Sequence, residues 1–202
     1  MAKADAKEKI LRASKSVFSR KGYKKATVAD ILSEAGVARA TFYRYFPGKH
    51  EVFFELLRDM LGNLYENARD FFLREAKDAQ EWELTLREGL STFYRFFLEN
   101  RDIIQVYYSE AFVSDPRLYA LWDDFERKMT SVFTRILDGG VKRGSFRPMD
   151  TDLVANILLM IFVGVPNRYI IAGGRSDIDI ESIAREMVKL ASEGIVTRTY
   201  RA

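Results

Sequence analysis

Apolar residues recur every three or four positions along most of this 202-residue chain, which is the spacing of one face of an α-helix. In residues 28–35, for example, Val28, Ile31 and Ala35 fall on the same side of a helix. Strand-like alternation is scarce, and the few glycine and proline residues stand between the periodic segments. The sequence therefore predicts an all-α fold with about nine helices and no sheet.

Helix start and stop signals place these helices along the chain. They are expected near residues 7–21, 27–35, 39–46, 49–75, 81–99, 102–112, 116–139, 151–172 and 179–193. The tripeptide Ser114-Asp115-Pro116 predicts one start, because a capping residue precedes a proline at the first helical position. Pro166 lies inside a helical pattern and is expected to kink or break it. The helix from residue 49 would be about 35–40 Å long, enough to link two modules.

The chain contains no cysteine and a single histidine, which excludes several kinds of site. Disulfides, thiolate zinc sites and cysteine nucleophiles need cysteine, and multi-histidine metal sites need more than one histidine. The lack of cysteine fits a reducing cytosol. No nucleophile–base pair is recognisable, and Asp123 and Asp124 point apart on a helix, so they do not form a metal site. We therefore expect no enzyme, no metal site and no cofactor.

The formal net charge of +3 conceals an uneven distribution. Residues 1–50 contain 12 Lys and Arg against 4 Asp and Glu, a net charge of +8, whereas residues 51–202 carry −5. A basic segment on an acidic body indicates that the segment meets a polyanion. A solvated helical surface with uneven charge would give the same split, so charge alone leaves that alternative open.

We expect neither a secretory signal nor a membrane-spanning helix in this sequence. The first ten residues, MAKADAKEKI, have a basic start but no apolar core, so they do not resemble a secretory signal. The most apolar stretch, residues 153–165, contains Asn156 and is shorter than the about 20 apolar residues that a membrane-spanning helix needs. We expect this stretch to be a buried helix or a subunit interface, and the protein to be cytoplasmic without a membrane partner.

Residues 28–46 form a candidate helix-turn-helix. Two short helical patterns are separated by Gly36, and the second places Phe42 and Phe46 four residues apart on one side. That side can pack inward while the opposite side faces a DNA groove. The groups available for DNA are Arg39, Thr41, Tyr43, Arg44 and Tyr45. Any short helical hairpin can imitate the pattern, so the motif alone is moderately specific.

The exact string raises this specificity. Residues 27–54 read TVADILSEAGVARATFYRYFPGKHEVFF, and with the preceding FSRKGYKKA they resemble the N-terminal part of the TetR family of transcriptional regulators. The matching features are Phe18, Gly22, Thr27, the Ile31…Ala35-Gly36-Val37 turn, Thr41-Phe42-Tyr43-Arg44-Tyr45-Phe46 and Lys49. The resemblance covers about residues 7–60. It implies a DNA-binding domain at residues 1–50 and a ligand-binding and dimerisation domain at residues 51–202.

The resemblance also implies a function. Such proteins are usually homodimers that bind a near-palindromic operator, most often as repressors, and a small molecule in the C-terminal domain usually releases them. By position, Thr27 and Lys49 would meet phosphates, and Tyr43 and Tyr45 would touch the DNA backbone. Arg39 and Thr41 would face base edges, and Arg44 is a further candidate for guanine.

Three positions depart from the family pattern, and one of them is Ala40, which stands where glycine is frequent. Ala38 stands where a Ser or Thr cap is common, which costs the following helix about 1 kcal/mol. His50 replaces a common acidic residue, and we expect it to face solvent or a DNA phosphate. We expect Tyr43→Ala or Lys49→Ala to weaken DNA binding several-fold and to leave the thermal melt unchanged.

The C-terminal part is rich in aromatic residues, which form either core or a ligand pocket. The candidate ligand residues are Phe97, Tyr107, Tyr108, Phe112, Trp122, Phe125, Met129, Asn156, Met160 and Arg168. Their composition favours a hydrophobic or aromatic ligand, and burial of Arg168 would favour an acid or a thioester. The candidate dimer residues are Ile157, Ile161, Val165, Ile183, Met187 and Leu190. The alternative is that the last two helices are the central helices of a monomer.

The leading hypothesis is a ligand-responsive DNA-binding regulator, a repressor that binds a palindromic operator as a dimer and is released by a hydrophobic or aromatic small molecule. The alternative is a helical lipid or small-molecule binding protein whose basic N-terminal segment faces an anionic membrane. A helical enzyme is a third hypothesis, which the residue inventory disfavours.

Overall fold

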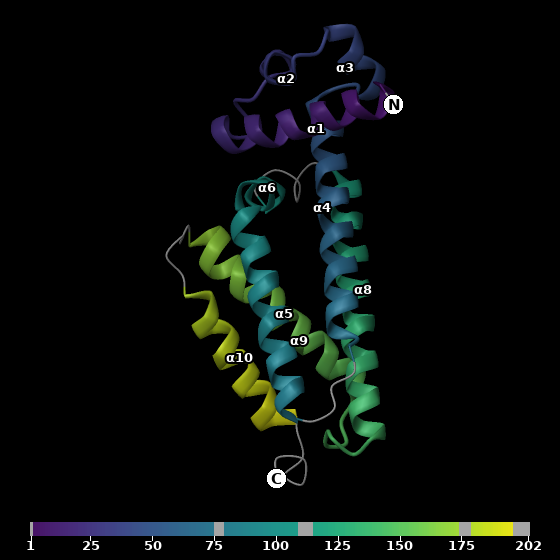
Figure 1. Ribbon diagram of the computed structural model, residues 1–202, viewed down its shortest axis with the longest axis vertical. Coiled ribbons are helices and arrows are strands. Elements are labelled where there is room, and N and C mark those ends of the chain that lie inside the picture. Colours follow the sequence, from purple (N-terminus) through teal and green to yellow (C-terminus); the bar gives the residue numbers. More distant parts are fainter. Residues whose placement is uncertain (1, 75–78, 109–114, 174–178, 196–202) are drawn as a thin grey trace. The chain divides into compact units, whose positions relative to one another are not determined.

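The structure is a computed structural model that describes residues 2–74, 79–108, 115–173 and 179–195. Within these ranges the regular structure is helical and contains no β-strand, which confirms the all-α prediction (Figure 1). The helices are α1 (Ala2–Lys21), α2 (Val28–Ala35), α3 (Arg39–Tyr45), α4 (Lys49–Phe72), α5 (Ala79–Glu99), α6 (Arg101–Val106), α8 (Pro116–Lys142), α9 (Thr151–Pro166), the π-helical η2 (Asn167–Ala172) and α10 (Ile180–Ile195).

The chain forms two compact units. The first comprises Met1–Gly62 and Arg101–Leu121, and the second comprises Asn63–Asn100 and Trp122–Ala202. Helix α4 begins in the first unit and ends in the second, as α8 also does. The first unit thus includes more than residues 1–50, and the point along the chain at which the DNA-binding function ends stays a prediction.

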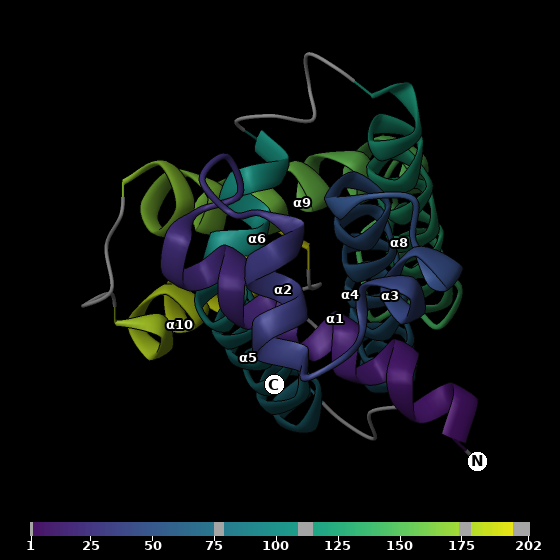
Figure 2. The ribbon, with the colours of Figure 1, turned by 90° about the horizontal axis from the view of Figure 1, so that it is seen from above.

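The first unit is built from short helices with well-defined ends. Helix α1 packs against α2, α3 and α6, and Figure 2 shows α2 lying over α1. Gly36 ends α2 with a φ of 62°, a left-handed conformation that glycine adopts without strain. A full capping box begins α2, because the Thr27 side chain accepts from the Asp30 N–H and the Asp30 carboxylate accepts from the Thr27 N–H.

Aspartates begin two further helices, and the start at residue 116 is the one that the tripeptide Ser114-Asp115-Pro116 predicted. Asp115 accepts the backbone N–H of Arg117 just ahead of α8, whose first residue is Pro116. Asp150 caps α9 by accepting the Leu153 N–H at 3.0 Å. These caps satisfy backbone donors that have no partner inside the helix.

Pro166 changes the type of helix instead of stopping it. Helix α9 ends at Pro166, and the chain continues as η2 to Ala172. Proline has no backbone N–H to continue the α-helical hydrogen-bond ladder, so the ladder must rearrange at this residue.

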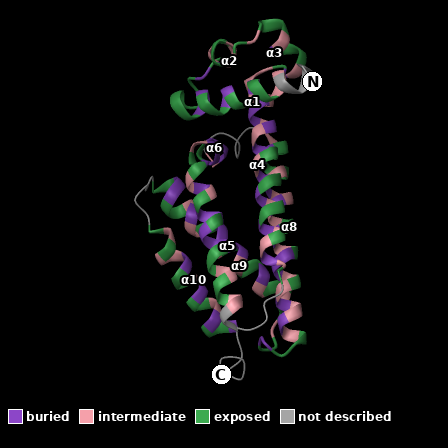
Figure 3. Cartoon of the chain, in the orientation of Figure 1, coloured by how far each residue is buried: buried purple, intermediate pink, exposed green. Residues whose placement is uncertain are grey.

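The core of the second unit is aromatic. The rings of Phe72, Phe133 and Phe162 come from α4, α8 and α9 and meet in edge-on contacts, with centroids 5.4–5.9 Å apart. Phe72 also lies so close to Gly89 of α5 that an added Cβ there would be 2.7 Å from its ring. Buried positions alternate with exposed ones along each of these helices (Figure 3). The aromatic enrichment of the sequence thus serves packing first.

Candidate functional site

Helix α3 separates a buried side from an exposed side within two turns. Phe42 is fully buried and Phe46, its C-terminal cap residue, is nearly so, while Tyr43 is 44% exposed. Arg39 and Arg44 are exposed as well. The aromatic pair therefore anchors the helix and leaves its cationic side open to a partner.

The exposed side of α3 combines cations with phenol groups. The Arg39 guanidinium lies 5.5 Å from the centre of the Tyr43 ring, and the Arg44 guanidinium lies 5.0 Å from the Tyr45 ring. Arg44 also donates to the Tyr45 hydroxyl at 3.3 Å. Tyr45 and Thr41 are half-buried. Guanidinium groups stacked on rings are partly ordered before binding, which lowers the entropy cost of DNA contacts.

The basic residues at the end of α1 form ion pairs with carboxylates of α2, unlike the arginines of α3. In α1, Arg20 pairs with Glu34 at 2.9 Å and Lys21 with Asp30 at 2.6 Å. Among the residues that the structure describes, no carboxylate lies within 4 Å of Arg39 or Arg44. The α3 cations thus keep their full charge for an external anion.

Lys49 holds the loop between α1 and α2. Its ammonium donates to the carbonyls of Tyr23, Lys24 and Ala26 at 2.8, 3.2 and 2.9 Å. An ammonium has three N–H groups, and all three are used in these contacts. The phosphate contact that the family pattern implies for Lys49 stays a prediction, but the geometry first assigns it a structural role.

Thr27 is similarly engaged. Its hydroxyl donates to the Asp30 carboxylate at 2.8 Å and accepts the Asp30 N–H at 3.2 Å. Hydrogen bonds from Lys21 and Thr27 lower the pKa of Asp30 to about 2, so this carboxylate is charged at neutral pH. A phosphate contact by Thr27 also stays a prediction. To donate to a phosphate, the Thr27 hydroxyl would have to give up its hydrogen bond to Asp30.

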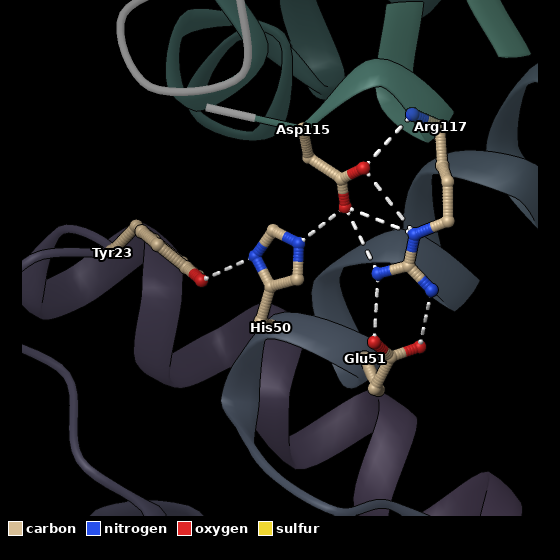
Figure 4. A network of polar contacts seen from close by, with 5 residues as sticks. All are labelled: Tyr23, His50, Glu51, Asp115 and Arg117. Atoms are coloured by element: carbon tan, nitrogen blue, oxygen red, sulfur yellow. Dashed lines mark hydrogen bonds and ion pairs between the residues drawn. The ribbon is translucent and has the colours of Figure 1, made fainter. Parts of the chain in front are cut away.

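His50 has two partners that the sequence did not predict. Its Nε2 lies 2.7 Å from the Asp115 carboxylate, and its Nδ1 lies 3.3 Å from the Tyr23 hydroxyl (Figure 4). The side chain is still 43% exposed, and a contact with a DNA phosphate stays a prediction. Arg117 bridges the same carboxylate to Glu51, at 2.9 and 2.8 Å. The network ties the start of α4 to the start of α8. Asp115 follows His50 by 65 residues, a proximity that only the fold creates.

Electrostatics within this network favour its charged form. The hydrogen bonds of Arg117 and His50 hold the pKa of Asp115 well below its usual range. The hydrogen bonds of Glu51 and Asp115 raise the pKa of the Arg117 guanidinium. The ion pairs of Arg117 with Asp115 and Glu51 therefore persist at neutral pH.

Of the predicted ligand residues, Asn156 and Met160 line one open hollow of the second unit together, and none is among the residues that line the apolar cavity described below. Phe97, Trp122, Phe125 and Met129 are buried in the core of the second unit. The tyrosines at positions 107 and 108 belong to the first unit. Asn156, Met160 and Arg168 are exposed on α9 and η2, and Phe112 lies outside the described residues. Their role in ligand binding stays a prediction.

An apolar cavity lies elsewhere among the described residues of the second unit. It has a volume of about 270 Å³ and is lined by the end of α4, the first half of α5, the second half of α8, residues 143–146, α9 and α10. Phe133, Phe146 and Phe162 form apolar walls, and Arg135 and Arg143 line it too. The sequence did not predict a ligand site in residues 133–146, because helical spacing alone does not distinguish a cavity wall from core.

The side chain of Phe146 is part of the cavity wall because α8 has a glycine opposite it. A Cβ added at Gly140 would lie 2.0 Å from the Phe146 ring. The same ring makes an edge contact with Trp82 at 5.5 Å. Gly140 thus lets the chain after α8 fold back closely on the helix.

Large apolar side chains are exposed on α9 and, separately, on α10. Leu153, Ile157 and Met160 of α9 are each about half exposed, and Leu190 of α10 is 63% exposed. Of the predicted dimer residues, Ile157 and Leu190 are on the exposed surface, while Ile161, Val165 and Ile183 are half-buried. Met187 is half-buried, lines the cavity and accepts a hydrogen bond from Tyr94.

The exposed apolar residues of α9 belong to a helical stretch with the bounds that the sequence predicted, residues 151–172. Among the described residues, Thr151–Ala172 is long and apolar enough to cross a membrane by length and composition, although core helices of soluble proteins pass the same test. Exposed apolar surface of this kind marks a contact with another apolar surface.

Comparison with known proteins assigns the family. Residues 10–56 match the family described as bacterial regulatory proteins, tetR family. Residues 80–195, more than half of the chain, match the family described as tetracyclin repressor-like, C-terminal domain. The chain belongs to the TetR family. It is a DNA-binding transcriptional regulator, and regulators of this family bind DNA operators as dimers and respond to small-molecule effectors.

Individual relatives agree with this assignment. The transcriptional repressor KstR2 of Mycobacterium tuberculosis is 29% identical over 150 residues, covering 72% of this TetR-family chain and 72% of KstR2. A TetR-family transcriptional regulator from Mesorhizobium loti has the same fold, with a TM-score of 0.79 at 18% identity over 98% of this chain and 100% of the other. The fatty acid degradation regulator FadR from Bacillus halodurans has a TM-score of 0.72 at 22% identity, covering 92% and 93%.

These findings confirm the resemblance inferred from the helix-turn-helix string, and the alternative of a membrane-facing lipid carrier is not favoured. The relatives are transcriptional regulators, not enzymes. The contact residues on DNA, the dimer residues and the effector site stay predictions.

Proposed function

We propose that this TetR-family protein is a cytoplasmic, non-enzymatic repressor that binds a palindromic operator as a homodimer and is released when a hydrophobic small molecule occupies the cavity of its second unit. The observation that carries the proposal is the exposed side of α3, where Arg39 and Arg44 stack on tyrosine rings and have no described carboxylate partner. Such a side is suited to phosphates and guanine edges, and its buried side is locked by Phe42.

On DNA, the residues of α3 divide into two roles. Arg39 and Arg44 present forked donors that match the acceptor pair of guanine in the major groove. The hydroxyls of Tyr43, Tyr45 and Thr41 are donors for the sugar-phosphate backbone, which positions the helix without reading sequence. Two copies of α3, about one DNA turn apart, would read the two halves of a palindrome.

The homodimer proposal is supported by exposed apolar residues of α9 and α10. Leu153, Ile157 and Met160 are each about half exposed at helical spacing on α9, and Leu190 is exposed on α10. Two copies of the same face bury each other in a twofold contact, in which every residue is used twice.

Release requires a path between the ligand and α3. Helix α4 offers one, because a single helix runs from Lys49, which holds the loop before α2, to Phe72, which lines the cavity. A ligand shifts the equilibrium only if it binds the DNA-incompetent form more tightly. The walls of the cavity are apolar, which supports a hydrophobic effector. Two structures with the same fold are described as a ketosteroid transcriptional regulator and a fatty acid degradation regulator, and both descriptions name hydrophobic compounds.

The test is DNA binding by the full chain, measured by fluorescence anisotropy with the DNA flanking its own gene and repeated over a range of salt concentrations. We expect a specific site whose affinity falls steeply with salt. Arg39→Ala is expected to weaken specific binding about tenfold or more and to leave the thermal melt unchanged. The matched control Arg87→Ala removes an exposed arginine of α5 and should have no effect. Binding without sequence preference or salt dependence contradicts the proposal.

A further inference from the structure

The cavity of the second unit has a cationic mouth. Arg74 follows α4, Arg135 lies on α8 and Arg143 follows α8, so three different segments each contribute one arginine to its lining. All three are exposed, whereas the phenylalanines deeper in the cavity are buried. No aspartate or glutamate is among the described residues that line this cavity.

Among the described residues, no acidic side chain neutralises these arginines. Within the described part of the chain, no carboxylate lies within 4 Å of Arg74, Arg135 or Arg143. Arg135 also borders a more open hollow that includes Asp123 and Asp152, and neither forms an ion pair with it. An uncompensated cluster of like charges costs repulsion unless an anion relieves it.

The position of Arg143 is set by the surface of α8. Its guanidinium lies 3.0 Å from where a Cβ of Gly139 would be, so it occupies the space that a side chain would otherwise fill. The Arg74 guanidinium is held differently, 4.9 Å from the centre of the Phe71 ring. Both cations therefore pack against the second unit, and neither has an ion pair with a described residue.

The chemistry of the mouth and the walls selects the occupant. The walls favour an apolar body, and the volume of about 270 Å³ exceeds the roughly 150 Å³ of a protein cavity known to accept benzene. The neutral polar lining groups, Thr85 and Ser145, are few compared with the three arginines. A neutral apolar molecule would leave the cations unused, and an organic cation would be repelled.

We propose that this cavity binds an amphiphilic anion, with an acyl chain or a small fused-ring body against the phenylalanine walls and a carboxylate or phosphate head between Arg135 and Arg143. The proposal deepens the proposed function, because it gives the chemical class of the effector and rests on that function only for the release of DNA. Charged hydrogen bonds of this kind contribute more than neutral ones, and the fork of arginine matches both head groups.

The experiment measures binding of simple probes to the full chain by calorimetry, below their micelle concentrations. Decanoate, decanol and decyltrimethylammonium share one chain length and differ in head charge, and decyl phosphate separates a phosphate from a carboxylate head. We expect decanoate or decyl phosphate to bind at least tenfold more tightly than decanol, and the ammonium to bind least.

Variants locate the binding. Arg143→Gln and Arg135→Gln are expected to weaken binding of the anion about tenfold each and to leave decanol unchanged. The control Arg87→Gln removes an α5 arginine outside the lining and should change neither. Leu86→Trp, which fills the cavity, should abolish binding of both probes. Thermal melts of each variant identify any loss of fold.

Equal affinities for decanoate and decanol, or anion binding that survives both arginine changes, would overturn this proposal. Anion binding that also survives Leu86→Trp would place the ligand outside the cavity and would overturn it as well. Operator binding separates it from the proposed function. If decanoate binds by these rules without releasing the operator, the cavity chemistry stands and the release mechanism fails. If a neutral apolar compound releases the operator and decanoate does not bind, the release mechanism stands and the proposed anionic ligand class fails.

Discussion

Replacing Lys49 by methionine separates a structural role from a DNA contact. The change keeps most of the aliphatic stem and removes the ammonium that donates to three carbonyls of residues 23–26. A hydrogen bond from a charged group contributes about 1.5–3 kcal/mol when well formed, but these carbonyls are partly open to water, so we expect a total loss of about 2 kcal/mol. In a chain of this size that lowers the melting temperature by about 4–8 °C.

This expectation differs from the one drawn from the sequence, in which the thermal melt of a Lys49 variant is unchanged. The assay is a thermal melt together with DNA anisotropy over a range of salt concentrations. We expect DNA binding to weaken because the loop before α2 loses its anchor, with little change in the salt slope. Lys25→Met is the matched control, since Lys25 is an exposed cation in the same loop.

The two roles predict different results. If Lys49 acts on phosphate alone, its variant melts normally, and the slope of log affinity against log salt falls by about one contact. An unchanged melt with that smaller slope would refute the structural argument. A lower melting temperature in Lys49→Met but not in Lys25→Met supports it.

Three further outcomes follow from packing and charge. The pKa of Asp115 is lower in the folded than in the unfolded chain, because Arg117 donates to its carboxylate. The carboxylate therefore stabilises the fold above a pH of about 4 and loses that effect as the pH falls further. In urea titrations Asp115→Asn should be less stable than the wild type at pH 7 and approach it near pH 2. Gly140→Ala should cost about 1–3 kcal/mol in the same assay, since its Cβ collides with the Phe146 ring, and an unchanged midpoint would contradict this packing. Ile157→Glu should convert a dimer to a folded monomer in analytical ultracentrifugation, and a persistent dimer would exclude this face.

Local features of the fold were predictable from the sequence because their causes are local. The capping box at Thr27, the glycine at position 36 and the cap at Asp150 depend on residues within four positions of one another. Helical spacing likewise placed Phe42 and Phe46 on the buried side of α3. The exposed side of α3 followed directly from that assignment.

Features that depend on distant residues were not predictable in this way. Asp115, one partner of His50, is 65 positions away, and the arginines at 74, 135 and 143 line one cavity only in the folded chain. A rich aromatic composition directed attention to residues such as Phe97 and Met129, which turned out to be core. An apolar side chain suits both a core position and a cavity wall, so composition alone does not distinguish the two.

The division of α3 into a locked side and an open side has a consequence for how such a regulator can change over generations. Phe42 and Phe46 carry the packing, while Arg39, Tyr43 and Arg44 add little to the core. Mutations at the outer positions can therefore accumulate without a penalty in foldability, and a duplicated gene could acquire a new set of target promoters one residue at a time. Recognition in this protein is free to drift while its architecture stays under selection.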